Sequence, residues 1–498
     1  MNPDCDLFII GGGINGTAIA ADAAGRGLSV ILCEKEDLSS GTSSTSSKLI
    51  HGGLRYLELY EFGLVKKALH EREILMKRAP ALITPLEFVL PHESHLRPAW
   101  MIKIGLFLYD HLAKRQRLPA SKSLRLQNDI RGKALLPHLT KGFSYFDCYT
   151  DDSKLVILNA LSAKQHNATI LTRTEFLSAE PNKNNWKIKL KNTITHEVFY
   201  RTAKTLINVA GPWVNKTQNN IQGAKPFDIK LIKGSHIIVP QLYEGNFAYI
   251  LQNKDQRIIF AIPFEGKYTL IGTTDILFSS DLENITISSS EINYLFEIIN
   301  DYFEKKVHYD DIIWSYAGVR CLQDQNEKPS KISRDYIFHF EYIKELPLLT
   351  VISGKLTTHR LLAEKALEKL RPIFKELKPV WTANVALPGG DFPNQDVTAY
   401  RKILKKDFPW LPDSLMNRYL KEYGTRIYSL LNEKKQLADL GIDFGHGLYQ
   451  AEVEFLLQHE WAKTAEDILW RRTKLGIAFS AVEREKLNNW LANQIPLA

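Results

Sequence analysis

The sequence predicts an α/β protein that continues into an all-helical domain. Three observations support this α/β plus all-α fold class. A glycine-rich turn stands between two short apolar runs in residues 6–34. Apolar and polar residues alternate around residues 231–275, which is typical of antiparallel strands. Beyond residue 388, apolar residues recur at helical spacing. Because a chain of 498 residues exceeds one compact core, two or three domains are expected.

The composition is that of a folded protein with an excess of positive charge. Hydrophobic residues make up 44% of the chain and charged residues 24%, which is ordinary for globular domains. The formal net charge is +8. This charge suits an anionic partner, such as a phosphorylated metabolite, an anionic membrane surface or a nucleic acid, and does not choose among them.

The cysteines and the apolar runs indicate in which cellular compartment the protein is expected. The four cysteines are scattered without C-x-x-C spacing, so neither a metal site nor a disulfide framework is expected. No run of about 18 apolar residues exists, so no transmembrane helix is expected. The N-terminus carries acidic residues where a signal peptide would carry cations. We therefore expect a protein of the cytoplasm or of a membrane surface, in reducing surroundings.

The N-terminal turn has the spacing of a dinucleotide-binding motif, G-x-G-x-x-G. A short buried strand is expected at Leu7–Ile10, and Gly11, Gly13 and Gly16 follow it. The first glycine permits the tight turn, the second lets backbone approach a pyrophosphate, and the third lets the helix lie close to the strand. The N-terminus of that helix offers free N–H groups to phosphates.

An acidic residue completes the motif. Glu34 ends the second expected strand, Leu28–Leu32, at about the right distance to accept hydrogen bonds from an adenosine ribose. A glycine-rich turn in an ordinary α/β fold is the competing interpretation, and it leaves Glu34 unexplained. The segment therefore predicts a dinucleotide site, but the motif does not distinguish FAD from NAD.

Hydroxyl side chains fill the segment that follows. Residues 39–47 read SSGTSSTSS, and KLIHGGLRY comes next. Hydroxyls and exposed backbone N–H groups at this point of the chain can bind a pyrophosphate and ring edges. A flexible serine-rich linker is the alternative, but the lysine, histidine, glycines and arginine that follow are unlike a linker.

Motifs spread over nearly the whole chain carry a more specific signal. They are FIIGGGINGTAIAADAAGRGLSV, TSSTSSKLIHGGLRYLELYEFGLV, LRPAWMIKIGLFLYDHL, NVAGPWV, LIKGSHIIVP, IGTTD, GVR, SGKLTTHRLLAEKAL, LPGGDF and DLGIDFGHGLYQAEVEFLLQHEWAKTAEDILWRRTKLG. Together they resemble the FAD-dependent aerobic glycerol-3-phosphate dehydrogenases, among the glutathione-reductase-type and D-amino-acid-oxidase-like flavoproteins. The resemblance implies oxidation of sn-glycerol 3-phosphate to dihydroxyacetone phosphate by hydride transfer from C2 to N5 of FAD, with electrons passed to a membrane quinone.

The resemblance also implies three domains: a discontinuous FAD-binding domain of Rossmann type, an antiparallel-sheet substrate domain and a C-terminal helical domain. A linker rich in proline, glycine and asparagine, Leu387–Asp396, precedes the last of these. The expected ranges are 1–80, 146–228 and 330–375 for FAD binding, 81–145 and 229–329 for substrate binding, and 388–498 for the helical domain. The role of the helical domain is left open.

The resemblance implies a set of cofactor-binding residues. The hydroxyl segment would wrap the pyrophosphate and the flavin ring, and the glycines after it would let backbone pass against the flavin. A helix opened by SGKLTTHR, with Thr357 or Thr358 near its N-cap, would direct its N-terminus at the pyrimidine edge of the flavin. The residues expected to bind FAD are Gly11, Gly13, Ile14, Asn15, Gly16, Glu34, Thr42, Ser46, Ser47, Lys48, Leu49, His51, Gly52, Gly211, Gly354, Lys355, Leu356 and Thr357. A covalent flavin link through His51 stays open, although the resemblance implies a non-covalent one.

A phosphate dianion that leaves water needs several cations and donors. The expected phosphate cations are Arg55, Arg320 and Lys355, and the expected neutral donors are Tyr56 and Thr274. These residues are distant in sequence and meet only if the fold brings them to the flavin, as the resemblance implies. Taken alone, Lys355 would be interpreted as a solvated loop residue.

The reaction also needs a base for the O2 proton of the substrate. We assign His236 to this role, with His51 as the alternative, and we place Arg320 among the catalytic residues. Because His236 stands among alternating apolar residues, a buried sheet histidine is the competing interpretation.

The segment Leu96–Arg117 mixes aromatic and aliphatic residues with lysines and arginines. Such a pattern is typical of an amphipathic helix in a membrane interface, and a core-packing helix is the alternative. The quinone acceptor implied by the resemblance favours peripheral binding to the anionic cytoplasmic face of the inner membrane. A homodimer is left open.

Two other functions compete with this interpretation. One is a flavin oxidase of the same fold that acts on an amine and reduces oxygen, which the three expected phosphate cations argue against. The other is a flavoprotein that binds RNA through its positive charge. Because no RNA-binding signature accompanies the charge, no nucleic-acid partner is expected. An NAD enzyme is less favoured than either.

Overall fold

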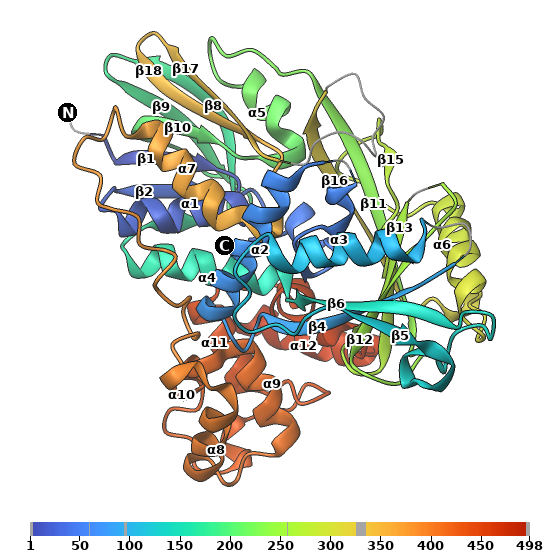
Figure 1. The fold of residues 1–498 in the computed structure, drawn as a ribbon. Coiled ribbons are helices and arrows are strands. Elements are labelled where there is room, and N and C mark those ends of the chain that lie inside the picture. The colour runs from blue at the N-terminus through green and yellow to red at the C-terminus, as the bar shows by residue number, and fades with distance from the viewer. Residues whose placement is uncertain (1–2, 59, 94–96, 256, 325–334, 495–498) are drawn as a thin grey trace.

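The computed structural model describes residues 3–58, 60–93, 97–255, 257–324 and 335–494. Within them the chain forms two sheets flanked by helices and a separate helical domain (Figure 1). The fold class expected from the sequence is confirmed. Leu96, the domain boundary expected at 329/330 and residues 495–498 lie outside the described residues.

The first sheet contains the strands of the nucleotide motif. Its strands are β1 (Cys5–Ile10), β2 (Val30–Cys33), β7 (Thr169–Leu171), β8 (Thr174–Asn182), β9 (Asn185–Asn192), β10 (Val198–Asn208), β17 (Ile337–Ile343) and β18 (Leu346–Ile352). The order along the sheet is β17–β18–β10–β1–β2–β7, and the last five of these are parallel. Such strands are covered on both faces, which is why β1 and β18 read as nearly continuous apolar runs.

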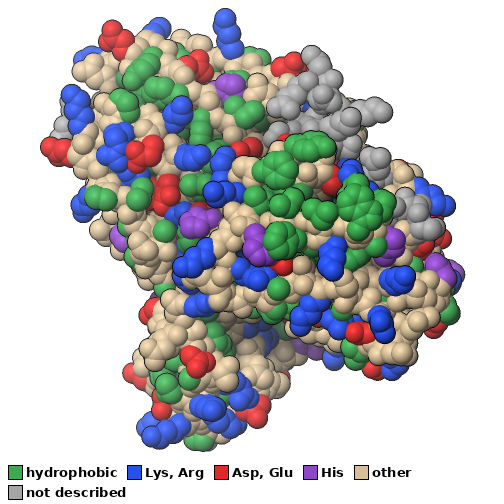
Figure 2. All heavy atoms as spheres, viewed as in Figure 1, with side chains coloured by type: hydrophobic (Ala, Val, Ile, Leu, Met, Phe, Trp, Pro, Cys, Tyr) green, Lys and Arg blue, Asp and Glu red, His purple; other side chains and the backbone are tan. Residues whose placement is uncertain are grey.

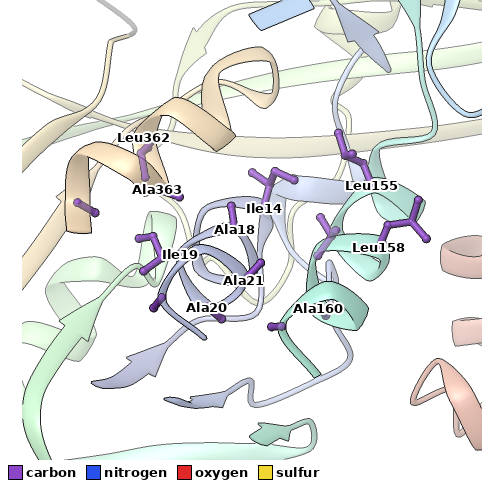
Figure 3. Packing of buried hydrophobic residues seen from close by; sticks show 14 of the residues in the cluster. Ile14, Ala18, Ile19, Ala20, Ala21, Leu155, Leu158, Ala160, Leu362 and Ala363 are labelled. Atoms are coloured by element: carbon purple, nitrogen blue, oxygen red, sulfur yellow. The ribbon is translucent and has the colours of Figure 1, made fainter. Parts of the chain in front are cut away.

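Small residues let a helix pack closely on this sheet. Helix α1 (Ile14–Gly25) lies between α4 (Asp152–Gln165) and α7 (His359–Leu370), as Figure 3 shows. The alanines of α1 are buried against these helices. A Cβ added at Gly16 would lie 1.9 Å from the carbonyl oxygen of Gly11, so only glycine allows this approach.

The second sheet is mostly antiparallel. Its strands are β3 (Leu49–Ile50), β4 (Thr84–Pro91), β5 (Lys122–Arg125), β6 (Lys141–Tyr149), β11 (Ile229–Pro240), β12 (Phe247–Gln252), β13 (Ile258–Phe264), β14 (Tyr268–Gly272), β15 (Ile276–Leu277) and β16 (Trp314–Gln323). The domain boundary expected between residues 145 and 146 falls inside β6. The reason is that β6 pairs with β4 through to Tyr149, and β3 pairs with the same end of β6.

Helices cover both faces of the second sheet. Helix α6 (Ser289–Tyr302) packs on one face, while α2 (Phe62–Arg78) and α3 (Ala99–His111) pack on the other. Successive residues of β11 alternate between these two cores, as expected for a strand covered on both sides. Figure 1 shows α3 running along the outside of the molecule.

The C-terminal domain is helical, as expected. It comprises α8 (Val397–Asp407), α9 (Asp413–Tyr423), α10 (Ile427–Leu430), α11 (Gln450–His459), a π-helical turn η11 (Asp467–Arg472) and α12 (Ala481–Gln494). These helices have a hydrophobic core of their own. Figure 1 shows α8, α9 and α10 at the bottom of the view, with α12 near β4 and β12 of the second sheet. Among the described helices, none has the length and apolar character needed to cross a bilayer.

Candidate active site

A cavity of about 670 Å³ lies where residues of the two sheets meet. The walls come from the ends of β1, β2, β10 and β18 and from β11 and β16. The carboxyl ends of parallel strands are the usual ligand-binding edge of such a sheet. The residues predicted from the sequence that line it are Gly11, Gly13, Ile14, Asn15, Glu34, Thr42, Ser46, Ser47, Leu49, His51, Tyr56, Gly211, Arg320, Gly354, Lys355, Leu356 and Thr357.

The glycine turn forms one wall. Gly11 has a φ of +119°, and a Cβ added there would lie 2.7 Å from the carbonyl oxygen of Val209. At the first turn of α1, the Ile14 N–H donates to Ser43 Oγ at 3.0 Å. Ser43 belongs to the hydroxyl segment, so this segment folds back onto the helix N-terminus where phosphates would bind.

Glu34 joins this turn to the end of β2. Its carboxylate accepts the N–H of Gly12 at 2.8 Å and that of Glu36 at 3.0 Å. Burial raises the pKa of Glu34 above its ordinary value, and the two N–H donors act in the opposite direction. The residue therefore positions the turn as well as lining the cavity.

The hydroxyl segment is anchored by the first residue of α4. Asp152 Oδ2 accepts the Ser46 N–H at 3.1 Å and the Ser46 hydroxyl at 2.7 Å. Asp152 Oδ1 accepts Lys48 Nζ at 2.8 Å, and both side chains are buried. The Lys48 ammonium is thus engaged behind the segment and lies outside the cavity lining.

The loop after this segment contacts the start of α7. The His51 N–H donates to Thr357 Oγ1 at 3.1 Å, and this hydroxyl lies 3.2 Å from the His51 carbonyl oxygen. Thr357 is in the short helix η7 (Leu356–Thr358) that precedes α7. Thr358 is the N-cap residue of α7, in agreement with the prediction, although its side chain makes no capping hydrogen bond. The Thr357 hydroxyl holds the loop.

Two expected phosphate cations reach the cavity from different sheets. Lys355 follows β18, and its Nζ lies 3.6 Å from the centroid of the Tyr56 ring. Arg320 lies on β16, with Nη1 3.6 Å from Asp275 Oδ1. Arg55 is on the same short helix as Tyr56, η2 (Leu54–Leu57), and is half-buried outside the lining.

Thr274 also lies outside the lining. Its buried hydroxyl donates to Glu291 Oε1 at 2.7 Å and accepts the Ser235 N–H at 2.9 Å. Glu291 in turn accepts Lys233 Nζ at 2.8 Å. The adjacent Thr273 lines the cavity. Two neighbouring threonines have the same side chain, so residue type alone did not distinguish them.

His236 lies behind the lining and contacts it through a serine. Its Nε2 is 2.9 Å from Ser47 Oγ, and its ring stacks on Tyr316. A Cβ at Gly272 would lie 2.1 Å from the imidazole, so that glycine makes room for it. Burial lowers the pKa of His236 well below its usual range, and the charges of Lys48 and Arg320 act in the same direction. The imidazole is therefore neutral at pH 7.

Other lining residues were missed at the sequence level. They include Lys35, Phe176, Lys216, Gly234, Thr273 and Gly318, all outside the expected hydroxyl segment 39–47. One signal was available: Gly318 interrupts a strand, which often marks a close approach. A Cβ there would lie 1.9 Å from Thr45 Oγ1. Gly52 and Gly16 lie outside the lining and act through packing and backbone hydrogen bonds.

Residues 6–360 of the chain match the family described as FAD dependent oxidoreductase. The protein belongs to this family of FAD-dependent oxidoreductases. Residues 380–489 match the C-terminal domain of alpha-glycerophosphate oxidase. Both matches agree with the division between the sheets and the helical domain.

Curated relatives of this FAD-dependent oxidoreductase cover nearly its whole length. It is 50% identical to a glycerol-3-phosphate dehydrogenase of Pseudomonas aeruginosa, over 99% of this chain and 96% of the relative. It is 47% identical to the aerobic glycerol-3-phosphate dehydrogenase of Escherichia coli, over 98% and 97%. It is 46% identical to a D-erythritol 1-phosphate dehydrogenase of Brucella abortus, over 98% of each. A solved glycerol-3-phosphate dehydrogenase from Bacillus halodurans complexed with FAD aligns with a TM-score of 0.74 and 25% identity, over 99% of this chain and 95% of that one.

The cavity of this oxidoreductase fits FAD. Gly211 has a φ of +55°, and no atom lies within 4 Å of an added Cβ, so backbone borders open space there. A Cβ added at Gly13 would lie 3.0 Å from Ser43 Oγ, so a side chain would crowd the turn at the helix N-terminus. The residues that would hold the pyrophosphate are those of the glycine turn and the hydroxyl segment, and the flavin is expected beside His51 and Leu356, which also line the cavity.

Proposed function

We propose that the protein oxidises sn-glycerol 3-phosphate to dihydroxyacetone phosphate. Curated relatives that bear the name glycerol-3-phosphate dehydrogenase, at 47–50% identity over nearly the full length, support the reaction. The observation that carries the proposal is the approach of Arg320 and Lys355, from two different sheets, to one cavity lined by the dinucleotide motif. A phosphate monoester needs such paired cations beside a flavin, and an amine does not.

The cations hold the substrate phosphate. Arg320 offers a planar fork that matches two phosphate oxygens, and Lys355 adds a point charge. The Tyr56 ring lies under the Lys355 ammonium and stabilises it in place. Arg55 adds positive charge beside Tyr56. Thr273 is the better neutral donor because it lines the cavity, and its hydroxyl would exchange its bond to the Thr274 carbonyl oxygen, at 3.1 Å, for one to the phosphate. Thr274 supports it from behind through Glu291.

A held phosphate orients the carbon that is oxidised. When bound, FAD supplies the hydride acceptor, N5, for the hydrogen on C2. Binding energy from the phosphate end fixes C2 in position, so the reaction gains from orientation.

The protein also removes the O2 proton. Ser47 Oγ is on the cavity wall, and His236 Nε2 lies 2.9 Å behind it. The neutral imidazole can accept the Ser47 proton while the Ser47 oxygen accepts one from the substrate. His236 is therefore our base, acting through Ser47, and His51 on the cavity wall is the alternative.

We propose that electrons then pass to a membrane quinone and that the protein binds the anionic cytoplasmic face of the inner membrane. Figure 2 shows hydrophobic side chains gathered over α3 with lysines and arginines around them. Trp100, Ile104 and Phe107 on this helix are 62%, 51% and 60% exposed. Apolar side chains ringed by cations suit an anionic lipid interface.

The first experiment is the visible spectrum of the purified protein before and after anaerobic addition of sn-glycerol 3-phosphate. Loss of the oxidised flavin band with this substrate, and not with glycerol, supports the proposal. D-Erythritol 1-phosphate is the second candidate, because a relative of 46% identity bears that name. Faster bleaching by it reassigns the substrate, and bleaching only by an amine, with peroxide formed in air, rejects the phosphate assignment.

Membrane binding and the acceptor are tested separately. Sedimentation with vesicles that contain phosphatidylglycerol at low salt should carry the protein down, and neutral vesicles should carry down less. Substrate-dependent reduction of a soluble ubiquinone analogue tests the acceptor. Light scattering of the purified protein decides whether it is a homodimer, and retention of tRNA at low salt would bring back the RNA-binding alternative.

A further inference from the structure

The C-terminal domain contacts the nucleotide-binding domain through a buried carboxylate. Asp37 is fully buried, and both of its oxygens accept hydrogen bonds from Arg472, from Nη1 at 2.8 Å and from Nη2 at 2.9 Å. Arg471 Nε donates to the same carboxylate at 2.7 Å. Two successive arginines of one domain therefore hold a single aspartate of the other.

Asp37 stands in the loop that follows β2, and several residues of this loop line the FAD cavity. Three residues before it, Glu34 accepts the Gly12 N–H; two residues after it, the Ser39 N–H donates to the Gly12 carbonyl oxygen at 3.1 Å. Glu34 and Ser39 both line the cavity. A displacement of Asp37 would therefore move the glycine turn and the residue expected to bind the adenosine ribose.

A second arginine contact ties the same loop to the π-helical turn. Arg173 Nη1 donates to Glu36 Oε2 at 2.7 Å, and its Nη2 donates to Asp467 Oδ1 at 2.9 Å. Asp467 opens η11, and Arg472 closes it. One turn of the C-terminal domain thus contacts the 34–39 loop both directly and through Arg173.

Stability alone does not explain these buried charges. Apolar residues of similar size at a domain interface are commonly as stabilising as a buried ion pair. The bidentate pair also fixes the orientation of the Asp37 carboxylate, because a planar guanidinium holds both of its oxygens. The π-helical turn, a form often found at functional sites, is the element from which consecutive Arg471 and Arg472 both reach Asp37.

We propose that the C-terminal domain is a positioning element for FAD, and that Arg472, aided by Arg471, holds the adenosine-binding loop in its binding conformation through Asp37. This assigns a role to a domain whose sequence does not indicate one. It concerns retention of the cofactor and does not depend on which phosphorylated polyol is oxidised.

The test is the rate at which the holoenzyme releases FAD. Release is followed by the rise of flavin fluorescence after dilution, and the Kd comes from titrating FAD back. Arg472→Gln should release FAD about tenfold faster and raise the Kd by a similar factor. The matched control is Arg418→Gln. It breaks a bidentate pair with buried Glu452, formed within the C-terminal domain with both bonds at 2.6 Å. The control should stay within about twofold of the wild type.

A second variant keeps the proposal testable if the first does not fold. Asp37→Asn removes the same charge pair from the other side, preserves the loop length, and should also release FAD about tenfold faster. A folded Arg472→Gln or Asp37→Asn protein with wild-type FAD release would overturn the proposal. So would an Arg418→Gln protein that loses FAD equally fast, because the effect would then come from general loosening of the domain.

Discussion

The hydroxyl of Tyr109 accepts the Gly52 N–H at 2.9 Å and donates to the Asp147 carboxylate at 2.7 Å. Tyr109 lies on the buried side of α3. The opposite side of this helix carries the exposed apolar side chains. Gly52 follows His51, which lines the FAD cavity. Arg72 Nη1 donates to the same carboxylate at 2.6 Å. The helix proposed to meet lipid is therefore joined by a hydrogen bond to Gly52, the residue next to His51 in the cavity wall.

Replacing Tyr109 by Phe should loosen that wall. The change leaves the Gly52 N–H without its phenolic acceptor and removes a donor from a buried carboxylate, at a cost of about 1–3 kcal/mol. If part of this cost appears in the transition state, kcat/KM for sn-glycerol 3-phosphate falls about tenfold. The control is Tyr145→Phe, since the Tyr145 ring packs edge-on against Tyr109. Equal losses in the two variants would show a packing effect and no special role for the hydroxyl.

Removing the side chain of either proposed phosphate cation should weaken substrate binding. Arg320→Ala and Lys355→Ala should each lower kcat/KM tenfold or more, on the scale of one charge-assisted contact. The inhibition constant for inorganic phosphate should rise in parallel, because both effects come from the same oxygens. Lys66→Ala, at an exposed position on α2, is the control. Unchanged kinetics in both site variants would remove these residues from the phosphate site.

The pH dependence tests the base. Since burial holds the pKa of His236 well below its usual range, the imidazole is already neutral at pH 6. His236 stays in its neutral, basic form at all higher pH values. The plot of kcat against pH should therefore show no change near pH 6.5 from His236, and kcat should fall only in more acidic solution. His236→Gln should lose about a hundredfold or more in kcat, and Ser47→Ala should lose less. A His236→Gln enzyme with the wild-type kcat profile would transfer the role to His51.

The exposed aromatics of α3 should govern vesicle binding. Trp100→Ser combined with Phe107→Ser removes two large side chains that would enter the interface, and each is expected to contribute about 1–2 kcal/mol. Sedimentation with anionic vesicles should weaken more than tenfold while the FAD spectrum stays unchanged. Val482→Ser, at a residue that is 75% exposed on α12, is the control. Binding that survives the double change would place the membrane contact elsewhere.

The parts of the fold that sequence predicted well are those set by local geometry. Gly11 needs a left-handed φ and Gly16 needs the absence of a Cβ, and both requirements are visible in the spacing of the motif. The resemblance to the dehydrogenases carried the rest of the expected FAD site, and the family and the cofactor are confirmed. The expected roles of individual site residues stay predictions, to be decided by the variants proposed above.

Long-range pairing was beyond sequence reasoning. The family resemblance implies that Lys48 binds the cofactor, yet its ammonium pairs with Asp152, more than a hundred positions away. Likewise, nothing in the sequence around Asp37 marks Arg472 as its partner. A charged residue that is buried needs a partner of opposite charge. The sequence does not show which residue the fold brings to it.

A buried histidine near the start of α7 should make the protein sensitive to acid. His359 Nδ1 lies 2.6 Å from the Leu356 carbonyl oxygen, and Asn159 Nδ2 lies 3.3 Å from His359 Nε2. These partners suit a neutral ring that donates from Nδ1 and accepts at Nε2. Burial lowers the pKa of His359 to about 3, against about 6.5 for an exposed histidine.

Between these two values the unfolded chain binds a proton that the native protein does not, so the free energy of unfolding falls as pH drops from about 6.5 toward 3. The slope from this one group is about 1.4 kcal/mol per pH unit. His359→Gln should be less stable than wild type at pH 7 and should lose less stability between pH 6.5 and 5, as measured by urea unfolding followed by circular dichroism. His70→Gln, at an exposed position on α2, should keep the wild-type slope. If the His359→Gln slope equals that of the wild type, other groups account for the acid sensitivity.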